Sequence, residues 1–287
     1  LTQSAGTGTT TLNGAVNTNG ATGVALTTNN ITVTGGITTT GSGPVTFTNA
    51  GTLALNSDIT SDGAIQQNGA GPVTTSGTRT LTTTGDGVSF AKALTLGGPL
   101  GIDTTSGAAA GSDITFSSTL DADAAANGRA LTLNAGTGGN LLFSGAVGST
   151  QRLGAITITN ANNVTESAGL TAASLTQSAG TGTTTLNGAV NTNGATGVAM
   201  TANAISVNNT VTAGGGANVA LTANPGGVSL GADVTTTGDV LITVGNAITR
   251  TAGTVSGNNV RLDAGTGIGT SAARVSTAAT TLAARTR

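Results

Sequence analysis

Hydrophobic and polar residues alternate along this chain in short stretches, which are separated by corners rich in Gly, Asn, Ser and Asp. One unit has apolar residues at Val45 and Phe47, then at Leu53 and Leu55, and then at Ile59. Alternation with a period of two places the apolar side chains of a β-strand on one face. Each unit of about 20–23 residues is therefore predicted to contain three short strands that share an apolar side.

One constant spacing relates successive units, from Gly41 to Gly63 and from Gly63 to Gly85, and an aliphatic residue usually stands four positions before the repeated Gly. One unit departs from this rule, because Asp103 occupies the aliphatic position and Ile102 stands one place early. Residues that recur at one spacing are predicted to stack in columns. The predicted structural ladder comprises Val16, Ile37, Ile59, Leu81, Val190, Val211 and Val234, with Gly20, Gly41, Gly63, Gly85 and Gly107 and with Thr38, Thr60, Thr82 and Thr104.

A single unit of this size cannot bury its apolar side, whereas stacked units can share one core. The pattern predicts an all-β, right-handed parallel β-helix with three strands per coil, continuous over residues 1–287. The alternative is an antiparallel sandwich or barrel, which needs longer strands and tight hairpin turns. Two-residue turns at regular hairpin spacing are largely missing, which favours the β-helix.

A second, longer repeat contains these units. Residues 1–25 and 175–199 are identical, and the similarity decays afterwards while the apolar positions persist. The internal repeat therefore spans 1–174 and restarts at 175–287, with eight units predicted in each full period. Because the first residue already lies inside a repeat, we expect the chain to be a fragment of a longer one.

The composition narrows the classes of function. Only 7% of the residues are charged and the net charge is −2, so the chain offers no basic surface for a nucleic acid. It lacks an apolar run of about 20 residues, which argues against membrane insertion. Without His or Cys, zinc and disulfides are not expected. The aromatic content of 1% fits a narrow lumen filled by aliphatic side chains.

Segments 43–65 and 238–277 resemble the repeat regions of filamentous-haemagglutinin-like giant adhesins of Gram-negative bacteria. Such proteins are passengers of two-partner secretion and autotransporter-type systems. The resemblance implies a β-helix that is secreted to the cell surface or into an extracellular filament. It also implies attachment to host or neighbouring-cell surfaces or glycans. The expected function is a structural stalk or filament, with end-to-end self-association or continuation of the same chain. A carbohydrate-binding adhesin segment is the alternative.

Candidate chemistry is sparse, and no catalytic residue and no cofactor are predicted. Asp121 and Asp123 share a predicted strand face near Arg129, an arrangement that polysaccharide-degrading β-helix enzymes use, but we expect a solvated corner. Calcium prefers clustered oxygen ligands. The corner carboxylates, which we expect to cap turns rather than bind calcium, are Asp58, Asp62, Asp86 and Asp103.

Three further features are predicted to be structural. Aligned Thr residues suggest an ice-binding array, but Asp62 interrupts the second column, so we expect a solvated strand face. The glycines of 265–272 suggest a phosphate loop but precede no predicted helix. Arg274, Arg285 and Arg287 are expected to be ordinary surface charge.

Overall fold

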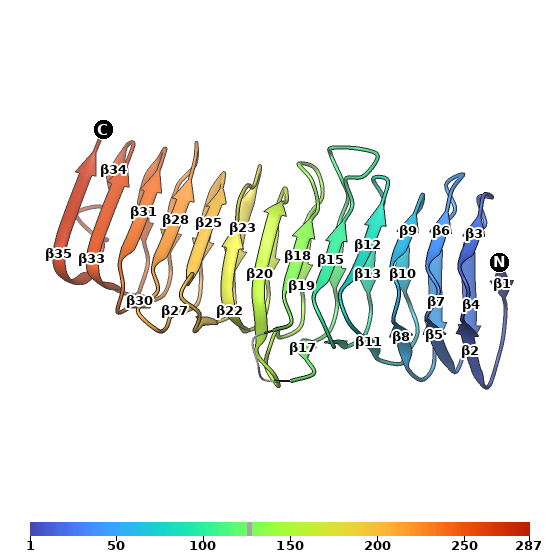
Figure 1. Ribbon diagram of the computed structural model, residues 1–287. Coiled ribbons are helices and arrows are strands. Elements are labelled where there is room, and N and C mark those ends of the chain that lie inside the picture. Colours follow the sequence, from blue (N-terminus) through green and yellow to red (C-terminus); the bar gives the residue numbers. More distant parts are fainter. Residues whose placement is uncertain (125–127) are drawn as a thin grey trace.

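A computed structural model describes residues 1–124 and 128–287 as a β-solenoid of about 13 turns, with three parallel sheets and no helix among the described residues. Its coils lie side by side along one axis, with the two termini at opposite ends (Figure 1). The predicted fold class, an all-β parallel solenoid with three strands per coil, is confirmed. None of the described residues belongs to a helix long and apolar enough to cross a bilayer.

The first sheet runs the length of the solenoid and contains 13 strands. They are β1 (Thr2–Gln3), β4 (Val24–Thr28), β7 (Val45–Asn49), β10 (Ile65–Gln67), β13 (Val88–Phe90), β16 (Ile114–Phe116), β19 (Leu141–Phe143), β21 (Val164–Glu166), β23 (Thr183–Leu186), β26 (Ala204–Val207), β29 (Val228–Leu230), β32 (Ala247–Arg250) and β34 (Gly267–Ile268).

The second sheet covers the N-terminal part of another face and has six strands. They are β2 (Thr9–Leu12), β5 (Asn30–Val33), β8 (Leu53–Leu55), β11 (Val73–Thr75), β14 (Leu94–Leu96) and β17 (Leu120–Ala122).

The third sheet has 16 strands. They are β3 (Val16–Thr18), β6 (Ile37–Thr39), β9 (Ile59–Ser61), β12 (Arg79–Thr83), β15 (Leu100–Asp103), β18 (Leu131–Asn134), β20 (Leu153–Asn160), β22 (Leu170–Gln177), β24 (Val190–Thr192), β25 (Val198–Ala202), β27 (Val211–Ala213), β28 (Val219–Ala223), β30 (Val234–Thr236), β31 (Val240–Val244), β33 (Val255–Ala264) and β35 (Thr277–Thr286).

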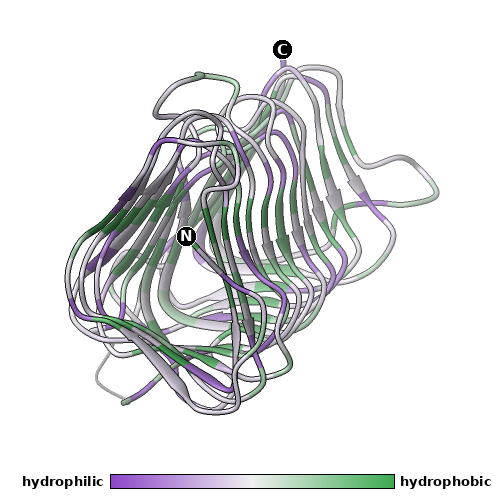
Figure 2. Cartoon of the chain, turned by 90° about the vertical axis from the view of Figure 1, so that its right-hand side faces the viewer, coloured by the Kyte–Doolittle hydropathy of each residue, from purple (hydrophilic) through white to green (hydrophobic). Residues whose placement is uncertain are grey.

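The core is an axial lumen filled by the inward residues of every strand. Val45 and Phe47 in β7 are at most 1% exposed, whereas Thr46 between them faces outward. Hydrophobic segments recur at the same places in successive coils (Figure 2). Burying one such aliphatic or aromatic side chain contributes about 1.5–3 kcal/mol, and no coil can do so without its neighbours.

The coils are not uniform in length. In the first sheet the partner of Val45 is Ile65, whereas the partner of Ile114 is Leu141, so the middle coils are longer and carry insertions. After β17, two isolated bridges at Val147 continue the second face. Beyond them β22 is a single strand of eight residues that spans two faces, pairing with β24 through its first half and β25 through its second.

Arg152 forms hydrogen bonds to two neighbouring coils near the end of the second sheet. Its guanidinium donates hydrogen bonds to the carbonyl oxygens of Ala172 at 2.7 Å and Asn191 at 2.9 Å, and to the Asn191 Oδ1 at 2.6 Å. These acceptors belong to two successive strands, β22 and β24. One side chain therefore bridges several coils at the place where the regular three-strand pattern changes.

The long repeat does not contain a whole number of coils, so the prediction of eight is wrong. In the first sheet, seven steps from Thr2 lead to Thr165 and the eighth leads to Thr185. Thr176, the counterpart of Thr2, lies between them and belongs to β22 in the third sheet. Inserted residues in the middle coils use up part of a turn, so the second copy of the sequence begins on a different face.

Candidate functional site

The predicted aliphatic ladder forms two columns. Val16 pairs with Ile37, Ile37 with Ile59, and Ile59 with Leu81. Later in the chain Val190 pairs with Val211, and Val211 with Val234. Six of these seven side chains are at most 1% exposed, and Val16 at the N-terminal end is half-buried. The spacing of the aliphatic residues therefore locates neighbouring coils correctly.

The Thr column is shorter than predicted. Thr38, Thr60 and Thr82 are register partners on the outer face. The partner of Thr82 is Asp103, because Leu81 pairs with Ile102, one position earlier than the constant spacing predicts. Thr104 is fully buried, and its hydroxyl donates to the Ser112 carbonyl at 3.0 Å, so its predicted place in the column is wrong. The inward aliphatic residue, and not a constant spacing, sets the register.

The glycines of the ladder differ in their roles. Gly41 and Gly85 have φ values of +65° and +113°, which favour glycine, whereas the other three have no positive φ. A Cβ at Gly63 would lie 2.8 Å from the Pro44 nitrogen, so that corner needs glycine for close approach. Gly107 approaches Thr84 in the same way. A Cβ at Gly20 would have no described atom within 4 Å, so this position requires glycine neither for its φ nor for close approach.

The corner aspartates cap backbone groups, often of an adjacent coil. Asp58 Oδ1 accepts a bond from the Thr80 amide at 2.9 Å. Asp62 accepts from the Ser42 amide and the Thr84 hydroxyl, both at 2.7 Å, and these bonds lower its pKa, with the amide bond contributing most. Asp103 Oδ1 accepts from the amide and hydroxyl of Thr105, at 2.8 and 2.6 Å. At Asp86, the backbone carbonyl accepts a bond from the hydroxyl of Thr83.

No three acidic side chains in the described part of the chain gather closely enough to hold a metal ion. The same capping pattern continues elsewhere. Asp113 accepts from the Asn140 amide at 2.7 Å and Asp233 from the Thr254 amide at 2.7 Å. Asp58, Asp113 and Asp233 thus each accept a hydrogen bond from a backbone amide of the next coil.

Asp121 and Asp123, the acidic pair considered above, bind different partners. Asp121 Oδ1 accepts from the amides of Thr150 and Gln151, at 2.8 and 3.3 Å. Asp123 instead binds the Arg129 Nε at 2.5 Å, and this hydrogen bond is the main cause of its lowered pKa. The two carboxylates therefore have different partners, one on the next coil and one in the adjoining loop.

The candidate ice-binding surface, formed by the aligned Thr residues, and the candidate phosphate loop at 265–272 also lie in regular structure. The Thr face contains Asp62, whose carboxylate binds Thr84, and it ends at Asp103. Segment 265–272 contains β34, and its Gly265 amide donates to the Val244 carbonyl at 3.1 Å and the Asn246 carbonyl at 2.9 Å. No helix follows it in the described residues.

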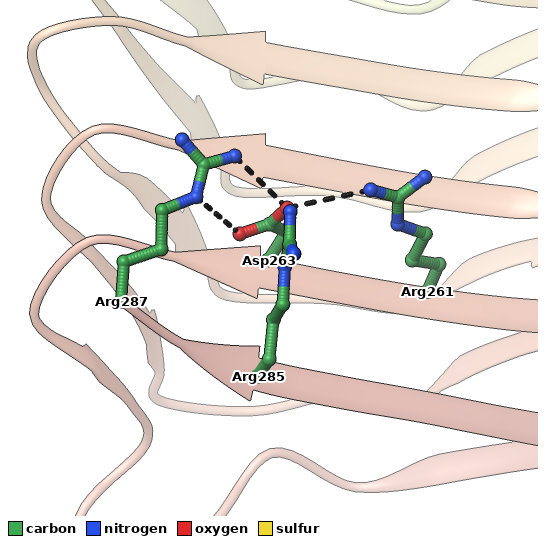
Figure 3. A network of polar contacts seen from close by, with 4 residues as sticks. All are labelled: Arg261, Asp263, Arg285 and Arg287. Carbon is green, nitrogen blue, oxygen red and sulfur yellow. Dashed lines mark hydrogen bonds and ion pairs between the residues drawn. The ribbon is translucent and has the colours of Figure 1, made fainter.

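A charged cluster at the C-terminal end was not predicted. The side chain of Asp263 in β33 is fully buried beneath three arginines (Figure 3). Arg285 donates from Nη2 at 2.6 Å, Arg287 at 3.0 Å, and Arg261 at 3.4 Å. These bonds, with Arg285 first, hold the pKa of Asp263 well below its usual range. Two of the three arginines that we expected to be ordinary surface charge, Arg285 and Arg287, therefore take part in an ion-pair network.

The spacing contained a signal for this cluster. Asp263 and Arg285 are register partners one coil apart, in β33 and β35. Opposite charges directly across a pair of strands stabilise it. The coil spacing alone therefore indicates that Asp263 and Arg285 form a pair.

All four Phe residues occupy one inward column of the first sheet. The order along the axis is Phe47, Gln67, Phe90, Phe116 and Phe143. The rings of Phe90 and Phe116 are 5.7 Å apart and those of Phe116 and Phe143 are 5.3 Å apart, both stacked. The Gln67 Nε2 within the column donates to the Asn49 Oδ1 at 2.8 Å and to the Gly69 carbonyl at 3.0 Å.

The sole Glu of the chain extends this column into a buried position. Glu166 pairs with Phe143 on one side and Leu186 on the other and is 1% exposed. Burial raises its pKa to about 7, and one hydrogen bond from the Gly188 amide opposes that shift. Glu166 was not predicted to be a site residue, although the alternation of residues in Val164–Glu166 places it inward.

A scan against protein-family models, a search of curated proteins and a search of solved structures each returned no match.

Proposed function

We propose that this chain is a structural stalk or filament segment of a secreted bacterial surface protein, of the filamentous-haemagglutinin-like kind. Its task would be to extend attachment sites away from the cell and to repeat them. The proposal rests on the shape of the fold and on the sequence resemblance of segments 43–65 and 238–277 to that class of adhesin.

One observation carries the proposal: polar side chains at corners and strand ends repeatedly accept hydrogen bonds from the backbone of a neighbouring coil. Asn30 Oδ1 accepts from the Thr52 amide at 2.8 Å and Asn163 Oδ1 from the Thr183 amide at 2.8 Å, as Asp58 and Asp233 do at other corners. Each of these bonds joins a side chain to the backbone of the neighbouring coil. Hydrogen bonds between successive coils oppose their separation, which suits a spacer that is under mechanical force.

Length follows directly from the repeat. Parallel strands stack about 4.8 Å apart, so about 13 coils make a rod of about 60 Å. Each added coil extends the rod and depends only on its neighbours. The identical copies at 1–25 and 175–199 fit a protein in which the number of coils matters more than any single position.

Electron microscopy of the native material, labelled with an antibody against this segment, tests the proposal. We expect label on thin unbranched fibres or stalks at the cell surface, in fractions that protease removes from intact cells. Label on compact particles, or label retained inside protease-treated cells, would overturn it.

A further inference from the structure

Glu166 is a buried carboxyl group in which only one of the two oxygen atoms accepts a hydrogen bond from the described residues. Its Oε2 accepts the Gly188 amide at 2.8 Å. Its Oε1 is buried and has no hydrogen-bond partner among the described residues. A Cβ at Gly188 would lie 2.5 Å from Oε1 and 1.9 Å from the Ala168 carbonyl oxygen, so these two oxygens are at most 4.4 Å apart. A protonated carboxyl can donate to such a carbonyl, whereas a carboxylate can only be repelled by it.

In the part of the chain that the structure describes, no neighbouring charge compensates a carboxylate at this position. The strands packed on either side, β19 and β23, contain no ionisable side chain. In residues 141–207 the only other charged residue is Arg152. Its guanidinium is engaged by the Ala172 and Asn191 carbonyls on another face. An ionised group buried without a partner is costly, so such groups are generally neutral.

We propose that Glu166 is protonated in the closed solenoid and makes the coil from β21 to β23 a pH-sensitive opening point of the rod. Loss of the proton leaves a carboxylate between Phe143 and Leu186 that only the Gly188 amide stabilises. The coil then opens to hydrate it. Opening would separate β21 from β23 while the coils further away stay paired.

The direction of the pH dependence follows from the proton balance. Burial holds the pKa of Glu166 at about 7 in the folded state, and the unfolded value is 4.5. The closed coil therefore binds a proton that the open coil has released over this range. Its stability is fully present below about pH 4.5 and falls as the pH rises towards 7. Opening of this coil is expected to increase on the order of a hundredfold between pH 4.5 and pH 8.

The single Glu makes a direct test possible. Protein labelled with ¹³C at the Glu side-chain carboxyl gives one resonance, which we expect to titrate near pH 7 in the folded chain. Midpoint titration near 4.5 in the folded chain would overturn the proposal. This measurement requires no substitution and does not depend on the proposed function.

Amide hydrogen exchange supplies the second test, with Glu166→Gln as the matched variant. Gln67 shows that this column accepts a glutamine. After correction for the intrinsic pH dependence, amides of β21 and β23 should lose protection between pH 5 and pH 8 in the unsubstituted chain and keep it in E166Q. The amides of β5 and β8 serve as an internal reference. Equal loss of protection in both proteins would overturn the proposal.

Discussion

Residues 1–25 and 175–199 have the same sequence but occupy different faces of the solenoid. Thr9–Leu12 forms β2 in the second sheet, and its copy Thr183–Leu186 forms β23 in the first. The same strand therefore fits either face. What the sequence specifies is which side chains point inward and where the chain turns, because each face of the lumen offers similar apolar surroundings.

Local hydrogen bonds are the same in the two copies. The Thr10 hydroxyl donates to Gln3 Oε1 at 2.7 Å, and the Thr184 hydroxyl donates to Gln177 Oε1 at 2.6 Å. Both partners of each pair lie close together in the sequence, so these bonds form within one coil. Short-range structure thus follows from the sequence on whichever face it falls.

Burial differs, because a coil lies beneath the second copy. Leu186 is 1% exposed and Leu12 is half-buried, although they are equivalent residues. In the second copy β21 and β22 cover the side towards the N-terminus, pairing with β23 and β24. Most of the stability of such a strand therefore comes from its neighbours in the stack.

The largest difference in stability between the two copies is expected when Leu186→Ala is compared with Leu12→Ala. Truncating the enclosed leucine should destabilise its coil by about 3 kcal/mol, through lost burial and a cavity. The same change at the half-buried residue should cost less than about 1 kcal/mol. Native-state hydrogen exchange is the suitable measurement, because it reports the opening of individual coils where a single unfolding transition does not.

The contrast should disappear when the first copy is given a neighbour. Placing residues 151–174 ahead of Leu1 recreates the sequence that precedes Leu175. In that extended chain, Leu12→Ala should become about as costly as Leu186→Ala. If Leu12→Ala stayed mild although the added coil was protected from exchange, the difference would come from the face occupied and not from stacking.

A smaller contrast is expected at equivalent glycines. A Cβ at Gly188 would lie 1.9 Å from the Ala168 carbonyl oxygen, whereas a Cβ at Gly14 would have no described atom within 4 Å. Neither glycine has a positive φ, so the difference is steric. Gly188→Ala should cost about 2 kcal/mol because backbone of the coil below must move, and Gly14→Ala should stay within about 0.5 kcal/mol. Equal protection of the two variants in hydrogen exchange would contradict the stacking seen between Ala168 and Gly188.

The fold could be predicted from the sequence because alternation and spacing report inward residues and coil length. The predicted register is wrong at the one coil where the spacing of Thr and Gly disagrees with the position of the aliphatic residue. The constant spacing of Thr and Gly predicts that Thr104 stacks on Thr82, whereas the position of Ile102 indicates a shift of one residue, and the structure contains that shift. The aliphatic residue sets the register because moving it out of the lumen would lose the free energy of its burial. Moving an outward Thr by one position costs little free energy.

Other features depend on distant residues that no local pattern reveals. One such feature is that β22 continues as a single strand over two faces, where it pairs with β24 through its first half and with β25 through its second. The number of turns between the identical copies depends on insertions in the coils between them. The partner of Asp263 could be read from the coil spacing, but the burial of its carboxylate needed the positions of Arg285 and Arg287.

The smallest difference in stability is expected when the Thr–Gln hydrogen bond that both copies contain is removed. Thr184→Val removes the hydroxyl that binds Gln177 Oε1 and leaves that oxygen in a residue that is 1% exposed. An unsatisfied buried acceptor costs about 1–2 kcal/mol. Thr10→Val makes the same change beside Gln3, which water can reach, and should alter stability by less than about 0.5 kcal/mol. Exchange of the amides of β23 and β2 measures both. A similar loss in the two variants would mean that the bond acts by shaping its own coil, and that the neighbouring coil adds nothing to its strength.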